Sequence, residues 1–193
     1  NNTYSSGNFL ATVYYRNNQR DITRYSDTIS QVQYQKLQNA GVDPNAILNT
    51  FINARSTNRL GAEFTLQQRF GPDFDISPSI DMQYRKVNVD QTQLALSNEG
   101  FNWDAKLMAN YKIQNKPGSV FNKLSFQLSG RYESAEVTAQ GRNLSRYSAD
   151  FALRKDLFKN NKGSIVFAIN DVFNSNRFGN IYDTELFYQE SFR

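Results

Sequence analysis

Hydrophobic and polar residues alternate along most of the chain with a period of two. The alternation is clearest between residues 60 and 113, where one parity is apolar and the other polar: Leu60, Ala62, Phe64 and Leu66 against Glu63, Thr65 and Gln67. Successive side chains of a β-strand point to opposite faces, so this period predicts strands with one apolar and one polar face.

The same alternation predicts eight strands, separated by breaks rich in Gly, Pro, Asn and Asp. Most are longer than the about 5–6 residues of an average strand, and several reach the about 9–11 residues that a tilted strand needs to cross a membrane. They cover residues 8–28, 51–70, 74–89, 101–113, 124–133, 147–157, 165–173 and 185–193. We therefore expect an all-β fold, an antiparallel up-and-down transmembrane β-barrel segment of about eight long strands.

Four features disturb the strand pattern. Residues 17–19 interrupt the first strand, and one continuous strand is favoured over a hairpin there. Pro78 cannot donate a ladder hydrogen bond, which predicts a bulge. Asp171 shares the apolar parity, where a carboxylate facing lipid is costly, so we expect a bulge near Asn170 or a strand that has already left the membrane. Lys155 also has the apolar parity, but it lies close to a turn and can extend to the headgroups.

Two connections are predicted to be long. Residues Ile29–Thr50 break the period of two. Within them, Tyr34–Gly41 predicts a short helix ended by its glycine, and the Asp-Pro pair at 43–44 resembles the start of a second helix that runs through Leu48. Asp90–Gly100 is predicted to be a polar loop.

The turns alternate between a short kind and a kind that is longer or richer in Gly and Asn. Short turns are expected at Gly71, Lys116 and Asn160, and the other kind around Tyr34, Gln91, Gly141 and Asn176. Outer-membrane barrels have short periplasmic turns and long extracellular loops. This asymmetry favours such a barrel, in the bacterial outer membrane, over a soluble β-sandwich.

Aromatic residues gather near the predicted strand ends. Outer-membrane barrels carry aromatic girdles at both membrane interfaces, whereas a soluble sandwich would bury such residues in its core. The predicted interfacial aromatics are Phe70, Phe74, Phe101, Trp103, Phe121, Tyr147 and Phe158.

The polar parity predicts a row of charges facing the barrel interior. Its members are Glu63, Arg69, Asp81, Arg85, Asp104, Lys106, Arg131, Glu133, Asp150 and Arg154. We expect these charges to alternate in sign from strand to strand. Pairing across strands or with a plug domain is favoured over contact with a transported substrate.

Composition narrows the function. The hydrophobic content of 39% and the mean hydropathy of −0.66 are too low for membrane-spanning helices, but suit strands of which one face is polar. The chain has no Cys and no His, which excludes disulfides, thiolate sites and Ser-His arrangements. We expect neither enzymatic activity nor a metal or other cofactor. The net charge of +4 is spread singly along the chain, so no nucleic-acid partner is expected.

Three segments resemble the barrel of TonB-dependent outer-membrane receptors, in particular its Bacteroidetes-type branch. They read FLATVYYRNNQRDITR, TFINARSTNRLGAEFTLQQRFGPDFDIS and RYSADFALRKDLFKNNKGSIVFAINDVFNSNRF. The resemblance implies a 22-stranded barrel, filled by an N-terminal plug, that imports a scarce nutrient such as a siderophore, glycan or peptide with energy from TonB. It implies as partners the outer-membrane lipid, the receptor's own plug, TonB and a surface lipoprotein.

The chain departs from that family pattern. It has about eight strands, no plug, no segment that contacts TonB, and no terminal strand ending in an aromatic residue. We expect residues 1–193 to form a single β-barrel segment, the C-terminal part of the receptor barrel without its plug domain and final strand. Isolated from its parent, such a segment should aggregate or pair through its edges.

Two other functions stay open at this point. Eight strands suffice for a small closed barrel with a structural or adhesive role. A soluble β-sandwich or solenoid binding module is the third possibility. The substrate is not encoded in the strands, and the connections Ile29–Thr50 and Asp90–Gly100 are the predicted contacts for a ligand or lipoprotein.

Overall fold

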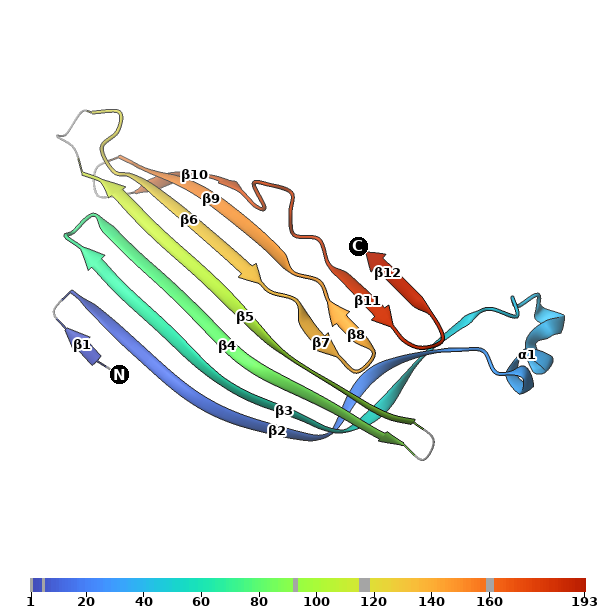
Figure 1. The fold of residues 1–193 in the computed structure, drawn as a ribbon. Coiled ribbons are helices and arrows are strands. Elements are labelled where there is room, and N and C mark those ends of the chain that lie inside the picture. The colour runs from blue at the N-terminus through green and yellow to red at the C-terminus, as the bar shows by residue number, and fades with distance from the viewer. Residues whose placement is uncertain (1, 5, 92–93, 115–118, 159–161) are drawn as a thin grey trace.

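A computed structural model of the protein describes residues 2–4, 6–91, 94–114, 119–158 and 162–193. Most of them form one antiparallel sheet, the main sheet, with the order β1-β2-β3-β4-β5-β6-β9-β10 (Figure 1). Its strands are β1 (Asn2–Tyr4), β2 (Gly7–Thr28), β3 (Ile47–Phe70), β4 (Phe74–Gln91), β5 (Leu94–Ile113), β6 (Leu124–Glu133), β9 (Arg146–Leu157) and β10 (Gly163–Ile169). The predicted all-β, antiparallel, up-and-down arrangement is confirmed.

A second, smaller sheet has the order β12-β11-β8-β7. Its strands are β7 (Glu136–Thr138), β8 (Gly141–Asn143), β11 (Gly179–Asp183) and β12 (Tyr188–Phe192). The helices α1 (Gln31–Leu37) and η1 (Gln38–Ala40) lie between β2 and β3. No helix in the described part of the chain has the length and apolar content for crossing a membrane.

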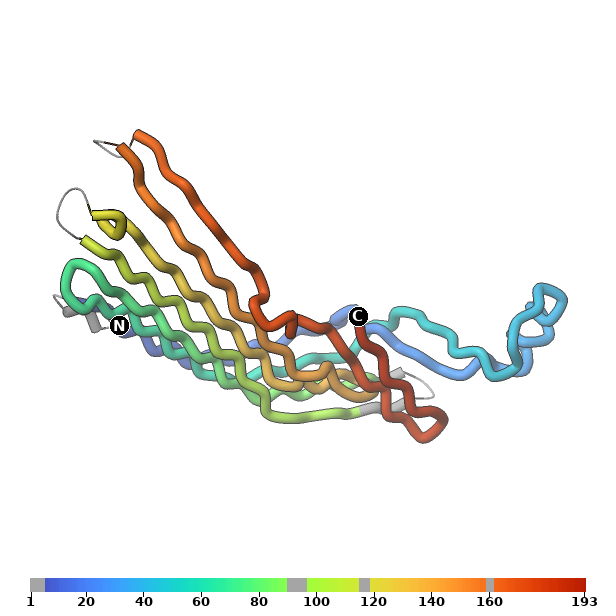
Figure 2. Tube along the Cα trace, turned by 90° about the horizontal axis from the view of Figure 1, so that it is seen from above, coloured from blue at the N-terminus to red at the C-terminus, as the bar shows by residue number. Residues whose placement is uncertain are grey.

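The four strands β2 to β5 contain 22, 24, 18 and 20 residues, about twice what a membrane crossing requires. The prediction of one continuous first strand is confirmed, because β2 and β3 keep one register from Gly7 opposite Gln68 to Thr28 opposite Ile47. The ladder skips one position, between the pairs Gln19–Ser56 and Asp21–Ala54, where Arg20 has a positive φ of 56°. Beyond it, the β2–β3 hairpin leaves the sheet and carries α1 at its tip (Figure 2).

The connection between β2 and β3 contains one of the two predicted helices. Ser30 caps α1 through a capping box with Gln33, and the following 3-10 turn ends at Gly41. The helix predicted from residue 43 is wrong. The Asp43 side chain accepts a hydrogen bond from the backbone N–H of Asn45 at 2.7 Å, which closes a turn, and the chain then enters β3 at Ile47.

The predicted loop Asp90–Gly100 is also wrong. β4 and β5 remain paired as far as Gln91 opposite Leu94, so all but residues 92–93, which lie outside the described part, belong to strands. The many polar residues of this stretch suggested a loop. However, the strands are held together by backbone hydrogen bonds, which do not depend on that polarity.

Pro78 does not cause the predicted bulge. The register between β3 and β4 is the same on either side of it, with Thr65 opposite Ser79 and Gln68 opposite Ile76. Two residue pairs between these positions are missing from the ladder, while Pro78 stays paired with Leu107 on β5. The absent N–H therefore weakens the pairing with β3 locally without inserting a residue.

The last third of the chain differs most from the prediction. β10 ends at Ile169 instead of Phe173, and Asp171 lies in the turn beyond it, so the strand itself contains no bulge at that residue. The strand predicted at 185–193 is β12, which pairs with β11 in the small sheet. The main sheet thus has the three-residue β1 in place of an eighth long strand.

The connections after β3, β5 and β9 meet at one end of the main sheet, called here the turn end, and those after β2, β4 and β6 at the other, the loop end (Figure 1). This assignment of ends agrees with the prediction. The predicted difference in length does not hold throughout, since residues 114–123 form a longer connection than residues 92–93. The turn residues at 115–118 and 159–161 lie outside the described part.

A small core forms where β7 and the residues after it pack on β3 and β4. It contains Ala54, Val87, Val89 and Ala139, with Ile52 against it. The rest of the main sheet is a single layer. Among the described residues no pairing joins β10 to β1 or β2, so the sheet is open (Figure 2).

Candidate functional site on the polar face

Charged residues on the polar face of the main sheet lie in rows across the strands. The arginine row, toward the loop end, consists of Arg16, Arg59 and Arg85, each directly opposite the next. The acidic row lies closer to the turn end and consists of Glu63, Asp81, Asp104 and Glu133, again opposite one another. The next row holds Lys106 opposite Arg131.

The predicted alternation of sign from strand to strand is therefore wrong. Neighbouring strands place like charges opposite each other, and the sign changes along each strand instead. Like charges directly opposite destabilise a sheet, so the rows require water or oppositely charged groups from elsewhere. Parity predicts the face on which a residue lies, but not the register that brings two residues together.

The acidic row is neutralised mainly at its β6 end. Glu133 forms ion pairs with Arg131 on its own strand and with Arg146 on β9. Within the described residues, Glu63 and Asp104 have no ion pair. Among the residues that the structure describes, no group of three or more His, Cys, Asp or Glu side chains is placed to hold a metal ion.

Asp81, in the middle of the acidic row, is bound by a tyrosine. The Tyr14 hydroxyl donates to its carboxylate, at 2.9 Å from Oδ1 and 3.2 Å from Oδ2. The ring passes over Gly61, where a Cβ atom would lie only 2.6 Å from the Tyr14 Cζ. The glycine of the Gly-Ala-Glu motif thus permits a contact that spans from β2 to β4.

Three of the predicted interior residues lie apart from these rows, closer to the turn end. Arg69 stands opposite Asp75. Asp150 accepts a hydrogen bond from the backbone N–H of Asp171 at 2.8 Å, and Arg154 pairs with Asp156 on its own strand at 2.9 Å. The other seven predicted residues lie in the arginine row, the acidic row and the basic row next to it: Glu63, Asp81, Arg85, Asp104, Lys106, Arg131 and Glu133.

Glu136 of β7 reaches the arginine row from the small sheet. Its carboxylate Oε1 lies 2.6 Å from Arg85 Nη1 and 3.9 Å from Arg59 Nη2. Glu136 is not among the predicted interior residues, because nothing in its local sequence pattern shows that β7 folds back over the polar face. Arg16 and Arg59 were also missed, although both have the parity of the predicted interior residues.

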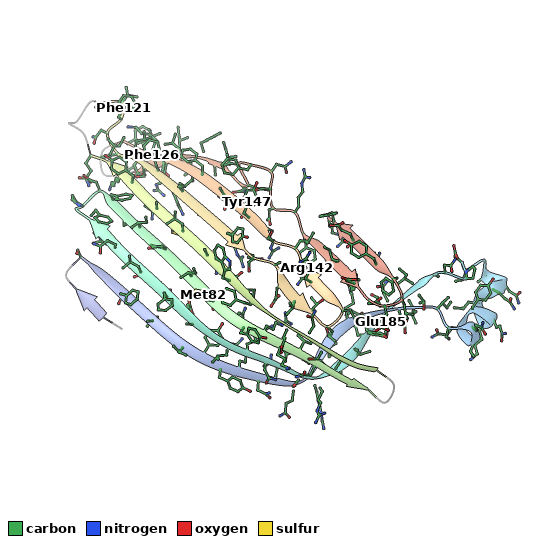
Figure 3. The ribbon with its side chains drawn as sticks, in the orientation of Figure 1. Met82, Phe121, Phe126, Arg142, Tyr147 and Glu185 are labelled. Atoms are coloured by element: carbon green, nitrogen blue, oxygen red, sulfur yellow. The ribbon has the colours of Figure 1, made fainter. Side chains whose placement is uncertain are left out.

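A cavity of about 690 Å³ lies at the loop end, between the end of β2 and the small sheet. Its polar and aromatic lining includes Tyr25, Asp27, Arg142, Asp183, Phe187 and Tyr188. Burial, and then the neighbouring Asp27 carboxylate, raise the pKa of the Tyr25 phenol. Figure 3 shows Arg142 and Glu185 on this side of the molecule, away from Phe121 and Phe126 at the turn end.

The opposite face of the main sheet is apolar and exposed. One cross-strand row consists of Tyr15, Leu60, Tyr84 and Phe101, with exposed fractions of 67%, 57%, 46% and 60%. Toward the turn end, Phe70 stacks on Phe74 at a ring distance of 5.6 Å, and Phe74 meets Tyr111 edge-on at 6.4 Å. In a soluble domain these side chains would be covered.

The remaining predicted girdle residues divide between the two ends. Phe121 and Phe158 follow β5 and β9 in the turn-end connections, and both are exposed. Trp103 and Tyr147 lie toward the loop end, with the Trp103 ring 4.6 Å from that of Tyr132. Lys155, for which a headgroup contact is predicted, donates to the backbone carbonyls of Val120 and Asn122 in the turn-end connection after β5.

Comparison with known families agrees with this two-faced sheet. The model of the outer membrane protein beta-barrel family matches residues 1–193. The chain belongs to this family. No curated protein and no solved structure matches the chain.

Membership of an outer-membrane β-barrel family places the protein in the bacterial outer membrane. In such a barrel the apolar face meets lipid and the polar face lines the interior. The segment of β4 from Phe74 to Tyr84 matches the about 9–11 residues of a tilted spanning strand. The loop-end halves of β2 to β5 consequently extend beyond the membrane.

One row of polar residues marks where the outer-membrane barrel leaves the lipid. It consists of Asn17, Asn58, Lys86 and Glu99, one step beyond the row of Tyr15, Leu60, Tyr84 and Phe101 on the same face. Lys86 and Glu99 form an exposed ion pair at 2.9 Å. Their hydrogen bond raises the pKa of Lys86 and lowers that of Glu99.

Proposed function

We propose that the protein is the barrel portion of a TonB-dependent receptor that imports a scarce nutrient such as a siderophore, glycan or peptide. The polar face carries this proposal. It presents ordered rows of charge, with Glu63 and Asp104 unpaired among the described residues, to the interior of an outer-membrane barrel. In a receptor barrel such a lining faces the plug and the path of the solute. The resemblance of three sequence segments to these receptors adds support.

The open edges of the main sheet favour a barrel larger than eight strands. β1 pairs only with residues 7–9 of β2, and the outer edge of β10 has no partner among the described residues. Unpaired backbone groups within hydrocarbon cost several kcal/mol each. Further strands would therefore complete the barrel, whereas a closed eight-stranded barrel would require β10 to pair with β1 or β2.

A plug domain is the natural partner of the charged rows. The arginine row forms ion pairs with one carboxylate, that of Glu136, and the acidic row is paired mainly at one end. A plug with complementary charges would neutralise both rows and would connect the barrel to TonB. The projecting hairpin tip with α1 is the proposed contact for ligand or for a surface lipoprotein.

The transport proposal is tested by growth. A strain lacking the full-length gene is grown with iron chelates, glycans or peptides as the limiting nutrient, beside a strain lacking TonB. We expect a shared defect on one class of nutrient, restored by the intact gene. A deletion strain that grows normally on nutrients whose use requires TonB would reject the proposal.

A second variant tests the hairpin tip. Thr28 and Ile47 are paired, so residues 29–46 can be replaced by a two-residue Asn-Gly turn without disturbing the ladder. Uptake should fall while the amount of protein in the outer membrane stays unchanged. Unchanged uptake would remove the tip from the binding surface but would leave the transport proposal intact.

A further inference from the structure

The arginine row has more capacity for anions than the protein itself uses. Arg16, Arg59 and Arg85 are directly opposite one another on three neighbouring strands. Cross-strand neighbours have Cβ atoms about 4.5–5.5 Å apart, so the three cations repel each other at short range. Only one carboxylate, from Glu136, forms ion pairs with them among the described residues.

Glu136 satisfies these arginines incompletely. It is close to Arg85 at 2.6 Å but only at the limit of contact with Arg59 at 3.9 Å. The Nε atoms of both arginines are buried and have no hydrogen-bond partner in the described part of the chain. A guanidinium has five donors in a planar fork that matches the two oxygens of a carboxylate. The donors of the two arginines therefore exceed those that the Glu136 carboxylate satisfies.

The position of β7 explains how Glu136 reaches the site. Gly100 stands opposite Arg85, and Val137 of β7 packs against it. A Cβ atom added at Gly100 would lie only 2.7 Å from Val137 Cγ1. The Asn98 side chain donates to the carbonyl oxygens of Thr138 and Gly141 at 2.8 and 2.9 Å. The backbone of the hairpin is thus fixed independently of Glu136, whose side chain can move without releasing β7.

We propose that Arg59 and Arg85 form a binding site for a carboxylate-bearing solute, and that Glu136 occupies this site in its absence. The solute replaces the Glu136 carboxylate between the two arginines, while Glu136 turns toward water. The side chains of Arg59 and Arg85 are 23% and 14% exposed, so the site is partly desolvated and an incoming anion interacts strongly. The site faces the barrel interior, which points to a soluble anion and away from a lipid headgroup.

This inference rests on the proposed function only in that the anion would be part of an imported solute. Binding to the purified protein requires neither TonB nor uptake. A failure of the growth experiment would therefore not affect the binding result, and a failure of binding would leave transport of another class of solute possible.

The test is calorimetric titration of the full-length protein in detergent micelles with citrate as the probe. In Glu136→Gln the internal competitor is removed, and citrate should bind at least about tenfold more tightly than to the unmodified protein. Adding Arg85→Gln to that variant should abolish the gain. Glu99→Gln is the matched control. It also removes one negative charge, but from the opposite face of the main sheet, on β5, the strand next to the one that carries Arg85.

Equal citrate affinity in Glu136→Gln and Glu99→Gln would overturn the proposal, since net charge alone would then explain the result. Tighter binding of inorganic phosphate than of citrate would overturn the assignment to carboxylates. Far-UV circular dichroism verifies folding. If Glu136→Gln does not fold, Glu136→Asp shortens the reach to the arginines and must also raise citrate affinity above that of the unmodified protein.

Discussion

The side chain of Gln140 binds both backbone groups of Ser26, a residue 114 positions earlier in the chain. Its Oε1 accepts from the Ser26 N–H and its Nε2 donates to the Ser26 carbonyl, each at 2.7 Å. Ser26 is 1% exposed and Gln140 7%. The side-chain amide thus acts as a one-residue neighbouring strand at the edge of β2, and it attaches the β7–β8 hairpin to the loop end of the main sheet.

Replacing Gln140 by Ala should release this attachment. Two buried backbone groups lose their partners, at about 1–3 kcal/mol each. We expect faster amide hydrogen exchange at Ser26 and through residues 136–143, with unchanged exchange in β4, measured by mass spectrometry. Gln127→Ala changes an exposed glutamine on β6 and is the control. Equal exchange in the two variants would show that the amide pair is not what holds the hairpin.

Gly61→Ala should destabilise the sheet through the Tyr14 contact. The added methyl would lie 2.6 Å from the Tyr14 ring and 2.9 Å from the Met82 carbonyl oxygen, and overpacking of this kind costs about 1–3 kcal/mol. The measurement is the free energy of unfolding by urea in lipid vesicles. Gly130→Ala is the control, because a Cβ added at Gly130 would have no atom within 4 Å beyond its chain neighbours. In a Tyr14→Ala background, the cost of Gly61→Ala should shrink to that of the Met82 contact.

Replacing Lys86 by Gln should raise the pKa of Glu99 toward its ordinary value. The hydrogen bond and charge of Lys86 hold that pKa low in the folded protein. A lowered folded pKa means that the pair stabilises the fold above the ordinary pKa of 4.5, and that this contribution is lost as the pH falls through the lowered value. The test is the carboxyl chemical shift of Glu99 against pH. The same titration curve in Lys86→Gln and unmodified protein would refute the assigned cause.

The sequence was sufficient to predict the two faces of the sheet but not the contacts across it. Period-two alternation identified Glu63 and Asp81 as interior residues, because the face of a strand residue depends on parity alone. That both belong to one row of like charge follows from the register, which depends on turn lengths and on every other strand pair. The sequence of residues 94–100 resembles that of a loop because it lacks a clear alternation of apolar and polar residues. Backbone hydrogen bonds nevertheless hold this stretch in β5.

The small sheet shows a second limit of sequence analysis. β7 and β8 have three residues each, too few for a periodic pattern, and β11, the second partner of β8, is nearly forty residues farther along the chain. Glu136 and Gln140 reach their partners only through this long-range fold. The arginine row could have been predicted from the sequence, since Arg16 and Arg59 have the same parity as the predicted interior residues.

The assignment of the apolar face to lipid is tested by a pair of adjacent arginine substitutions on β5. Leu107 lies near the middle of the apolar face, 38% exposed, opposite Pro78 and Gly130. Met108 is 44% exposed on the polar face, opposite Ser77 and Ser129. Leu107→Arg should cost about 2–4 kcal/mol, as for an arginine facing lipid near the bilayer midplane, because its charge must enter hydrocarbon.

Met108→Arg should change stability far less, since its side chain meets the hydrated interior. Both free energies of unfolding are measured on the full-length protein by urea titration in lipid vesicles, with far-UV circular dichroism reporting the transition. In detergent micelles, which adapt to an exposed charge more readily than a bilayer, the difference between the variants should decrease. A larger cost for Met108→Arg than for Leu107→Arg in vesicles would reverse the faces, with lipid on the side that bears the arginine and acidic rows.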